Sequence, residues 1–178
     1  MSDNQTIFVG VFEGFSWIRS EGKGSFMNSP FLKQFGEARI ADGETCVVVD
    51  LGGCTGMDST FMGTLAGIAK SSASTGGVLQ IADPGDRNRR SLEDLGLDYL
   101  MQIDPPGAVW NDSLDDIRDA LQNPPASGDI GELVRIKLSL EAHRALSDLS
   151  EENEEKFRDV VDMMAKDVKE KVLEDIES

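Results

Sequence analysis

Residues 45–74, TCVVVDLGGCTGMDSTFMGTLAGIAKSSAS, decide the fold of this chain. They begin with an apolar run over 46–51 that lacks alternation, and such a run predicts a strand buried on both faces. A glycine-rich turn is expected over 52–56. The motif Asp58-Ser59-Thr60 then opens a helix that extends to Ser72, because all three side chains can cap the free N–H groups of a first helical turn.

The hydroxyl of Ser59 occupies a special position in this stretch. It lies at the N-terminal end of the expected helix, next to the positive end of the helix dipole. The dipole and the free backbone N–H groups tolerate negative charge, so a phosphate dianion on this hydroxyl would be accommodated. Ser59 is therefore a candidate for a regulatory phosphate. The alternative interpretation is that the motif only caps the helix.

Strands and helices are expected to alternate on both sides of this stretch. Before it, the sequence predicts a strand over 7–12, a strand over 15–19 that pairs with the first as an antiparallel edge hairpin, and a helix over 30–40 capped by Ser29. After it, the sequence predicts a strand over 78–82, a short helix over 91–95 that ends at Gly96, a strand over 100–103, and a helix capped by Asp112 or Ser113. This order predicts an α/β fold in which helices cover the sheet.

The C-terminal part of the chain has a different composition. The segment NPPASG at 123–128 indicates a linker, so we divide the chain into a domain over 1–122, a linker over 123–131 and a helical extension over 132–178. Two apolar stripes at helical spacing run through the extension. The segment 147–153 could separate two helices, with Ser150 as an N-cap, and one continuous helix is the alternative. The stripes must be covered by the domain, by a partner or by a second copy of the chain, which makes a homodimer possible.

The charge of the chain limits its partners. It carries 33 acidic and 17 basic side chains, a net charge of −16 at pH 7, which argues against nucleic acid or a membrane surface as a partner. No segment approaches the run of about 18 apolar residues that crosses a bilayer, and the N-terminus lacks the basic start of a signal peptide. Cys46 and Cys54 have no metal-ligand spacing and fit small core residues in a reducing compartment. We therefore expect a cytoplasmic protein.

Four further features of the sequence bear on catalysis, metal binding and ligand binding. The glycine turn matches neither G-x-G-x-x-G nor a P-loop, so no nucleotide cofactor is expected. Asp50 ends the buried strand, and no third ligand lies at a useful spacing to form a metal site with Asp58. His143, the only histidine, has no nucleophile near it in the sequence, so we expect a solvated or interfacial role. The one concentrated basic patch is predicted as a solvated loop, or as a contact for an acidic partner or a phosphate: Arg87, Arg89 and Arg90.

Three segments together resemble a known family. These are VVVDLGGCTGMDSTFMGTLAGIA at 47–69, GGVLQIADP at 76–84 and LEDLGLDYLMQI at 92–103. In order and spacing they resemble the STAS domain family, and within it the bacterial anti-sigma factor antagonists. The resemblance covers roughly residues 6–121, and it implies a STAS-like mixed β-sheet flanked by helices for that part of the chain.

The resemblance also implies a site. In that family an Asp-Ser-Ser/Thr motif starts the helix after the central strand, and a partner serine kinase, itself an anti-sigma factor, phosphorylates the first serine. Here the motif is Asp58-Ser59-Thr60, which makes Ser59 the phosphoacceptor and Thr60 a secondary candidate. The implied partner surface comprises Asp58, Ser59, Thr60, Phe61 and Met62. The family commonly has glycine directly after the motif, where this chain has Phe61.

The expected function is therefore a phosphorylation-regulated binding module that needs no catalytic residues and no cofactor. As an anti-sigma factor antagonist it would bind the anti-sigma kinase by partner switching and so regulate transcription, and a serine phosphatase would reset it. Two alternatives stay open. One is a non-enzymatic STAS scaffold in a larger signalling assembly, held together by the C-terminal helices. The other is an enzyme or a small-ligand binder that uses the crevice above the glycine turn, with Asp50 in its chemistry.

Overall fold

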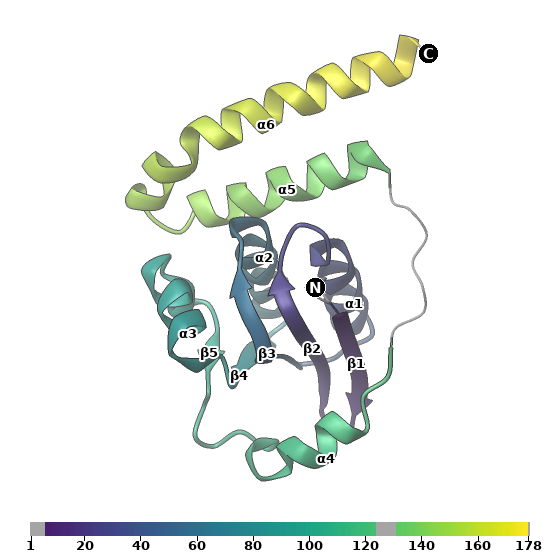
Figure 1. Ribbon diagram of the computed structural model, residues 1–178, viewed down its shortest axis with the longest axis vertical. Helices are drawn as coiled ribbons and strands as arrows, with labels where there is room; N and C mark the ends of the chain where they lie inside the picture. The colour runs from purple at the N-terminus through teal and green to yellow at the C-terminus, as the bar shows by residue number, and fades with distance from the viewer. Residues whose placement is uncertain (1–5, 124–130, 178) are drawn as a thin grey trace.

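Five strands form one mixed sheet. The structure, a computed structural model, describes residues 6–123 and 131–177, and its strand order is β1-β2-β3-β4-β5 (Figure 1). The antiparallel pair at one edge is β1 (Thr6–Phe12) and β2 (Phe15–Gly24), as predicted. The remaining neighbours are parallel: β2 with β3 (Cys46–Met57), β3 with β4 (Val78–Ala82), and β4 with β5 (Gln102–Ile103). The predicted α/β class is confirmed.

Helices cover both faces of this sheet. The larger hydrophobic core lies between the sheet and α1 (Ser29–Ala41), α2 (Ser59–Ser74) and α3 (Gly85–Asp94). A smaller cluster on the opposite face packs Trp17 and Trp110 against α4 (Leu114–Asp119). Successive residues of β3 alternate between these two clusters, as the period of a strand requires, so β3 is buried on both faces as expected. Two short 3₁₀ helices, Leu97–Tyr99 and Asn111–Ser113, complete this part of the chain.

The predicted glycine turn over 52–56 is wrong, because β3 continues through it to Met57. These residues pair with the far end of β2, which likewise runs five residues beyond the predicted end at 19. Packing against residues far away in the sequence explains why glycines occur within this strand. A Cβ atom at Gly52 would lie 2.5 Å from Nη2 of Arg118, and one at Gly53 would lie 3.0 Å from Nη2 of Arg19. The glycines therefore make room for two guanidinium groups above a strand.

Three element boundaries also differ from the prediction. α3 starts at Gly85 and not at 91, because the chain turns into it through positive φ angles of 53° at Asp83 and 73° at Gly85, so the basic patch is helical. α1 has Asn28 and not Ser29 at its N-cap, since the Ser29 hydroxyl donates to the Ser25 carbonyl. β5 is two residues long because the preceding residues form a 3₁₀ turn. Gly96 adopts the expected left-handed conformation after α3.

The C-terminal extension folds as two helices, so the alternative of one continuous helix is wrong. α5 (Glu132–Ser147) and α6 (Glu151–Glu177) lie together across one end of the sheet (Figure 1). Ser150 caps α6 as predicted, because its Oγ accepts a hydrogen bond from the N–H of Asn153 at 3.0 Å. Leu146 and Phe157 join the larger core. The domain and the second helix thus cover much of the apolar stripes.

Part of the predicted linker, 124–130, lies outside the described residues, and the division at 123–131 stays a prediction. Among the helices of the described ranges, none has the length and apolar character needed to cross a membrane.

Candidate functional site

Asp58 fixes the start of α2. Its Oδ1 accepts a hydrogen bond from the N–H of Phe61 at 2.8 Å, which is the expected capping bond. Its Oδ2 accepts from the N–H of Phe26 at 2.9 Å, and its own N–H donates to the carbonyl of Gly24 at 2.9 Å. Asp58 therefore ties the first turn of α2 to the loop between β2 and α1, and its carboxylate is held by backbone groups.

Ser59 is the first residue of α2, and its hydroxyl contacts the extension. Its Oγ lies 2.9 Å from Nε2 of His143 in α5, while Nδ1 of the same ring lies 2.7 Å from the carbonyl oxygen of Ser139. Because a carbonyl only accepts, Nδ1 carries the proton in the neutral ring, and the Ser59 hydroxyl donates to Nε2. His143 is 4 % exposed and packs edge to face on Phe157. Its role is interfacial, and the solvated alternative is wrong.

The other predicted partner residues face inward. Thr60 is 7 % exposed, Met62 is 9 % exposed, and Phe61 is completely buried in the larger core. The ring of Phe61 packs on the backbone of Gly24, where a Cβ atom would lie 2.9 Å from ring carbons. This packing explains how the chain accepts a phenylalanine directly after the motif. At the start of α2, only Asp58 and Ser59 are partly exposed.

The surface around Asp58 includes residues that the sequence did not indicate. Phe26 and Met27, in the loop that Asp58 holds, are more than half exposed. On another side, Lys23 and Arg87 line a shallow hollow together with Asp58. Arg87 belongs to the predicted basic patch, but no local pattern places it near the motif. The exposed end of α2 thus combines an acidic residue, two apolar side chains and two basic ones.

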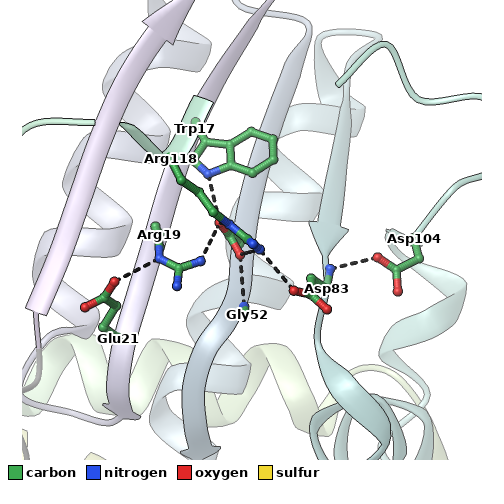
Figure 2. Close-up of polar contacts among 8 residues, drawn as sticks. Trp17, Arg19, Glu21, Gly52, Asp83, Asp104 and Arg118 are labelled. Atoms are coloured by element: carbon green, nitrogen blue, oxygen red, sulfur yellow. Dashed lines mark hydrogen bonds and ion pairs between the residues drawn. The ribbon is translucent and has the colours of Figure 1, made fainter. Parts of the chain in front are cut away.

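Asp50 forms the centre of a second polar cluster, on the face of the sheet that carries Trp17. Figure 2 labels the residues that surround it, among them Trp17, Arg19 and Arg118. It is fully buried and accepts two hydrogen bonds from Arg118 at 2.9 and 3.0 Å and one from Arg19 at 2.9 Å. The Trp17 indole N–H at 3.2 Å and the Gly52 N–H at 2.9 Å also donate to it. Five donors occupy this carboxylate, so it has little capacity left for a substrate or a metal ion. Through these hydrogen bonds Asp50, in β3, connects α4 to β2 and β3.

The lowered pKa of Asp50 predicts a loss of stability in acid. Burial acts to raise the pKa of this carboxyl, but the hydrogen bonds from Arg118, Gly52 and Arg19 outweigh it and hold the pKa below the usual value. Such a group stabilises the fold above its unfolded pKa of about 3.9, and the contribution disappears as pH falls through the lower folded pKa. We expect the urea midpoint to drop below about pH 4, and to drop less in Asp50→Asn, where residue 50 does not titrate. Parallel pH profiles of the two chains would contradict this.

The remaining candidate groups show no further site. Within residues 6–123 and 131–177, no cluster of three or more histidine, cysteine or carboxylate side chains could hold a metal ion. Cys46 and Cys54 are unpaired and partly buried. Burial, with the nearby Glu44, raises the pKa of the Cys46 thiol to about 11, and burial raises that of Cys54 as well. The raised pKa values favour the protonated form of both thiols, which is the weaker nucleophile.

Comparison with protein-family models identifies a match in this chain. The STAS domain model matches residues 9–106, more than half of the chain. No curated protein matches the chain.

Solved structures are similar over most of their own length. An anti-sigma factor antagonist from Mycobacterium paratuberculosis is 25% identical and aligns with a TM-score of 0.51, covering 67% of this chain and 98% of its own. The Thermotoga maritima protein TM1081 is 18% identical and aligns with a TM-score of 0.52. The alignment covers 62% of this chain and 86% of TM1081. The anti-sigma factor antagonist SpoIIAA, in its unphosphorylated form, is 16% identical and aligns with a TM-score of 0.50. The alignment covers 64% of this chain and 98% of SpoIIAA. The last two show likeness of fold alone.

Proposed function

This chain belongs to the STAS domain family, and on that premise we propose that it is an anti-sigma factor antagonist controlled by phosphorylation of Ser59. Unphosphorylated, it docks on an anti-sigma serine kinase and so releases the sigma factor for transcription. Phosphorylated by that kinase, it loses the interaction, and a serine phosphatase restores it. The protein acts in the cytoplasm and needs no catalytic residues of its own.

The position of Ser59 carries this proposal. It is the first residue of α2 and is partly exposed, whereas Thr60 beside it is buried. A helix N-terminus accepts negative charge, so a phosphate on Ser59 costs α2 little once the hydroxyl has left His143. The start of α2 can therefore exist with and without a charge of about −1.5 to −2 while the sheet and the helices that cover it keep their fold.

The charge acts on docking through Asp58. Both carboxylate oxygens of Asp58 accept backbone hydrogen bonds, so the residue cannot turn away from its neighbour. A phosphate on Ser59 would bring a second negative group next to it in an interface that excludes water, and like charges juxtaposed in this way oppose binding. The partner surface we propose centres on Asp58 and Ser59 and includes the exposed side chains of Phe26 and Met27. Phe61 and Met62 support it from within the core.

Mapping of the phosphate tests this function. The chain is incubated with ATP and each anti-sigma type serine kinase of the same genome in turn, and the modified residue is located by mass spectrometry. We expect phosphate on Ser59 and not on Thr60, because Ser59 is partly exposed and Thr60 is buried. Ser59→Ala is the control and should remain unmodified. Phosphate on neither residue with every kinase would refute the proposal.

A scaffold in a larger assembly is the second candidate, and exposed apolar side chains favour it. Met163, Leu173 and Ile176 of α6 are each more than half exposed, and a helix with such residues can pair with a second copy. Sedimentation analysis distinguishes the two functions. A large homo-oligomer that captures no anti-sigma kinase would support the scaffold, and a monomer or dimer that captures one would support the antagonist.

A further inference from the structure

The extension contacts α2 by a close backbone approach. A Cβ atom at Gly63 would lie 2.2 Å from the carbonyl oxygen of Ala142 and 2.5 Å from its carbonyl carbon. Real Cβ atoms do not come within 3.0 Å of such atoms, so only glycine at position 63 permits this packing. The face of α2 one turn after Ser59 is therefore in direct contact with the backbone of α5.

The residues before and after Ala142 in α5 also contact the domain. His143 accepts the hydrogen bond of the Ser59 hydroxyl, and Glu141 forms an ion pair with Lys33 of α1. Ala142 and His143 are 3 % and 4 % exposed. Three consecutive residues of α5 thus bind α1, the Gly63 backbone and the hydroxyl of the candidate phosphoacceptor. Figure 1 shows α5 lying across α2.

A separate anchor holds the corner between α5 and α6. Leu146 is completely buried in the larger core. The buried side-chain amide of Asn153 donates to the carbonyls of Leu95 at 2.9 Å and Leu146 at 3.0 Å. These contacts lie at the end of α3 and do not involve Ser59 or Gly63. The contact over Ser59 can therefore open while the corner keeps the extension attached to the domain.

We infer that α5 is a built-in occupant of the α2 surface that carries Ser59, and that it competes with any partner for that surface. A protein that docks on Ser59 must first displace residues 141–143. A phosphate on Ser59 also works against the docked α5, since it replaces the hydrogen that the hydroxyl donates to His143 and cannot lie along that 2.9 Å contact. The partner's identity rests on the proposed function, whereas the competition rests on the Gly63 and His143 contacts alone.

A matched pair of glycine variants tests this inference in the full chain. Gly63→Ala places a methyl group against the Ala142 backbone. Gly67→Ala, one turn further on α2, places the same methyl group in open space beside a cleft of 190 Å³. Alanine favours a helix over glycine at both positions by up to about 1 kcal/mol, so α2 itself should stay folded in both.

Amide hydrogen exchange reads out the position of α5. In Gly63→Ala we expect the amides of 139–147 to exchange at least about tenfold faster than in the parent chain, because local opening becomes easier. In Gly67→Ala their exchange should not change. The amides of 46–51 in β3 report on the fold and should be equally protected in all three chains. Unchanged exchange of 139–147 in Gly63→Ala would overturn the inference.

Phosphorylation by the kinase found in the mapping experiment then separates this inference from the proposed function. We expect Ser59 to be modified at least about tenfold faster in Gly63→Ala than in Gly67→Ala, in proportion to the exposed population. Faster exchange of α5 with equal phosphorylation rates would overturn the competition while leaving Ser59 as the phosphoacceptor. If no kinase modifies any of the chains, the proposed function fails, and the exchange result alone decides whether α5 covers this surface.

Discussion

Asp50→Asn is expected to lose about 3 kcal/mol of unfolding free energy, at the lower end of what the removal of one partner from a buried ion pair costs. The Asp50 carboxylate is fully buried and neutralises two arginines, Arg19 of β2 and Arg118 of α4. A neutral amide removes the buried charge that the two guanidinium groups share, and it leaves Arg19 only the exposed carboxylate of Glu21 and Arg118 only that of Asp83. Their side chains are 16% and 24% exposed, so water compensates for part of the loss, which is why we expect the lower end of the range.

Asp83→Asn is the matched control for this prediction. Asp83 pairs with the same Arg118 at 3.0 Å, but its side chain is 54% exposed, so its loss should cost less than about 1 kcal/mol. Asparagine also tolerates the left-handed φ of 53° at position 83. Urea titrations of the three chains give the midpoints and slopes from which the free energies follow. Equal losses in the two variants would contradict the central position that we assign to Asp50.

Ser59→Asp is expected to bind the anti-sigma kinase at least about 100-fold more weakly than Ser59→Ala, equivalent to about 3 kcal/mol. Both variants lack the hydroxyl that donates to His143, so they affect the α5 contact by the loss of the same hydrogen bond. They differ mainly in a negative charge next to Asp58. The comparison therefore measures the effect of charge on docking. Isothermal titration calorimetry with the purified kinase gives the two dissociation constants.

Ser74→Asp controls for the added charge itself. Ser74 is the last residue of α2 and is exposed, so this substitution makes the same change in net charge at the opposite end of the same helix. Its affinity should stay within about threefold of the parent chain, as is usual for a charge outside an interface. A similar weakening by Ser74→Asp and Ser59→Asp would mean that net charge, and not the position of Ser59, governs binding.

Local sequence patterns were sufficient for much of the fold. The apolar run of β3, the capping motif before α2 and the Ser150 cap of α6 are all signals within a few residues of the element they start. Each of these three was predicted and is present in the structure. Apolar spacing in the extension likewise indicated helices, and the cap at Ser150 distinguishes two helices from one.

Contacts between distant residues account for what the sequence did not reveal. A glycine-rich segment predicts a turn, and nothing nearby in the sequence indicates that Gly52 and Gly53 make room for Arg118 and Arg19. Asp50 has the sequence pattern of a polar strand end, since its arginine partners lie 31 and 68 positions away. Ser59 and His143 are 84 positions apart. A histidine on a helix gives no local sign of the hydroxyl that it will meet.

The phosphate itself provides the most direct test of the central claim, which is that Ser59 controls docking by its charge. The full chain is titrated into the kinase before phosphorylation, after complete phosphorylation at Ser59, and again after a serine phosphatase has removed the phosphate. We predict tight binding, then a loss of at least about 100-fold in affinity, then full recovery. Equal affinity of the phosphorylated and unphosphorylated chains would contradict the claim.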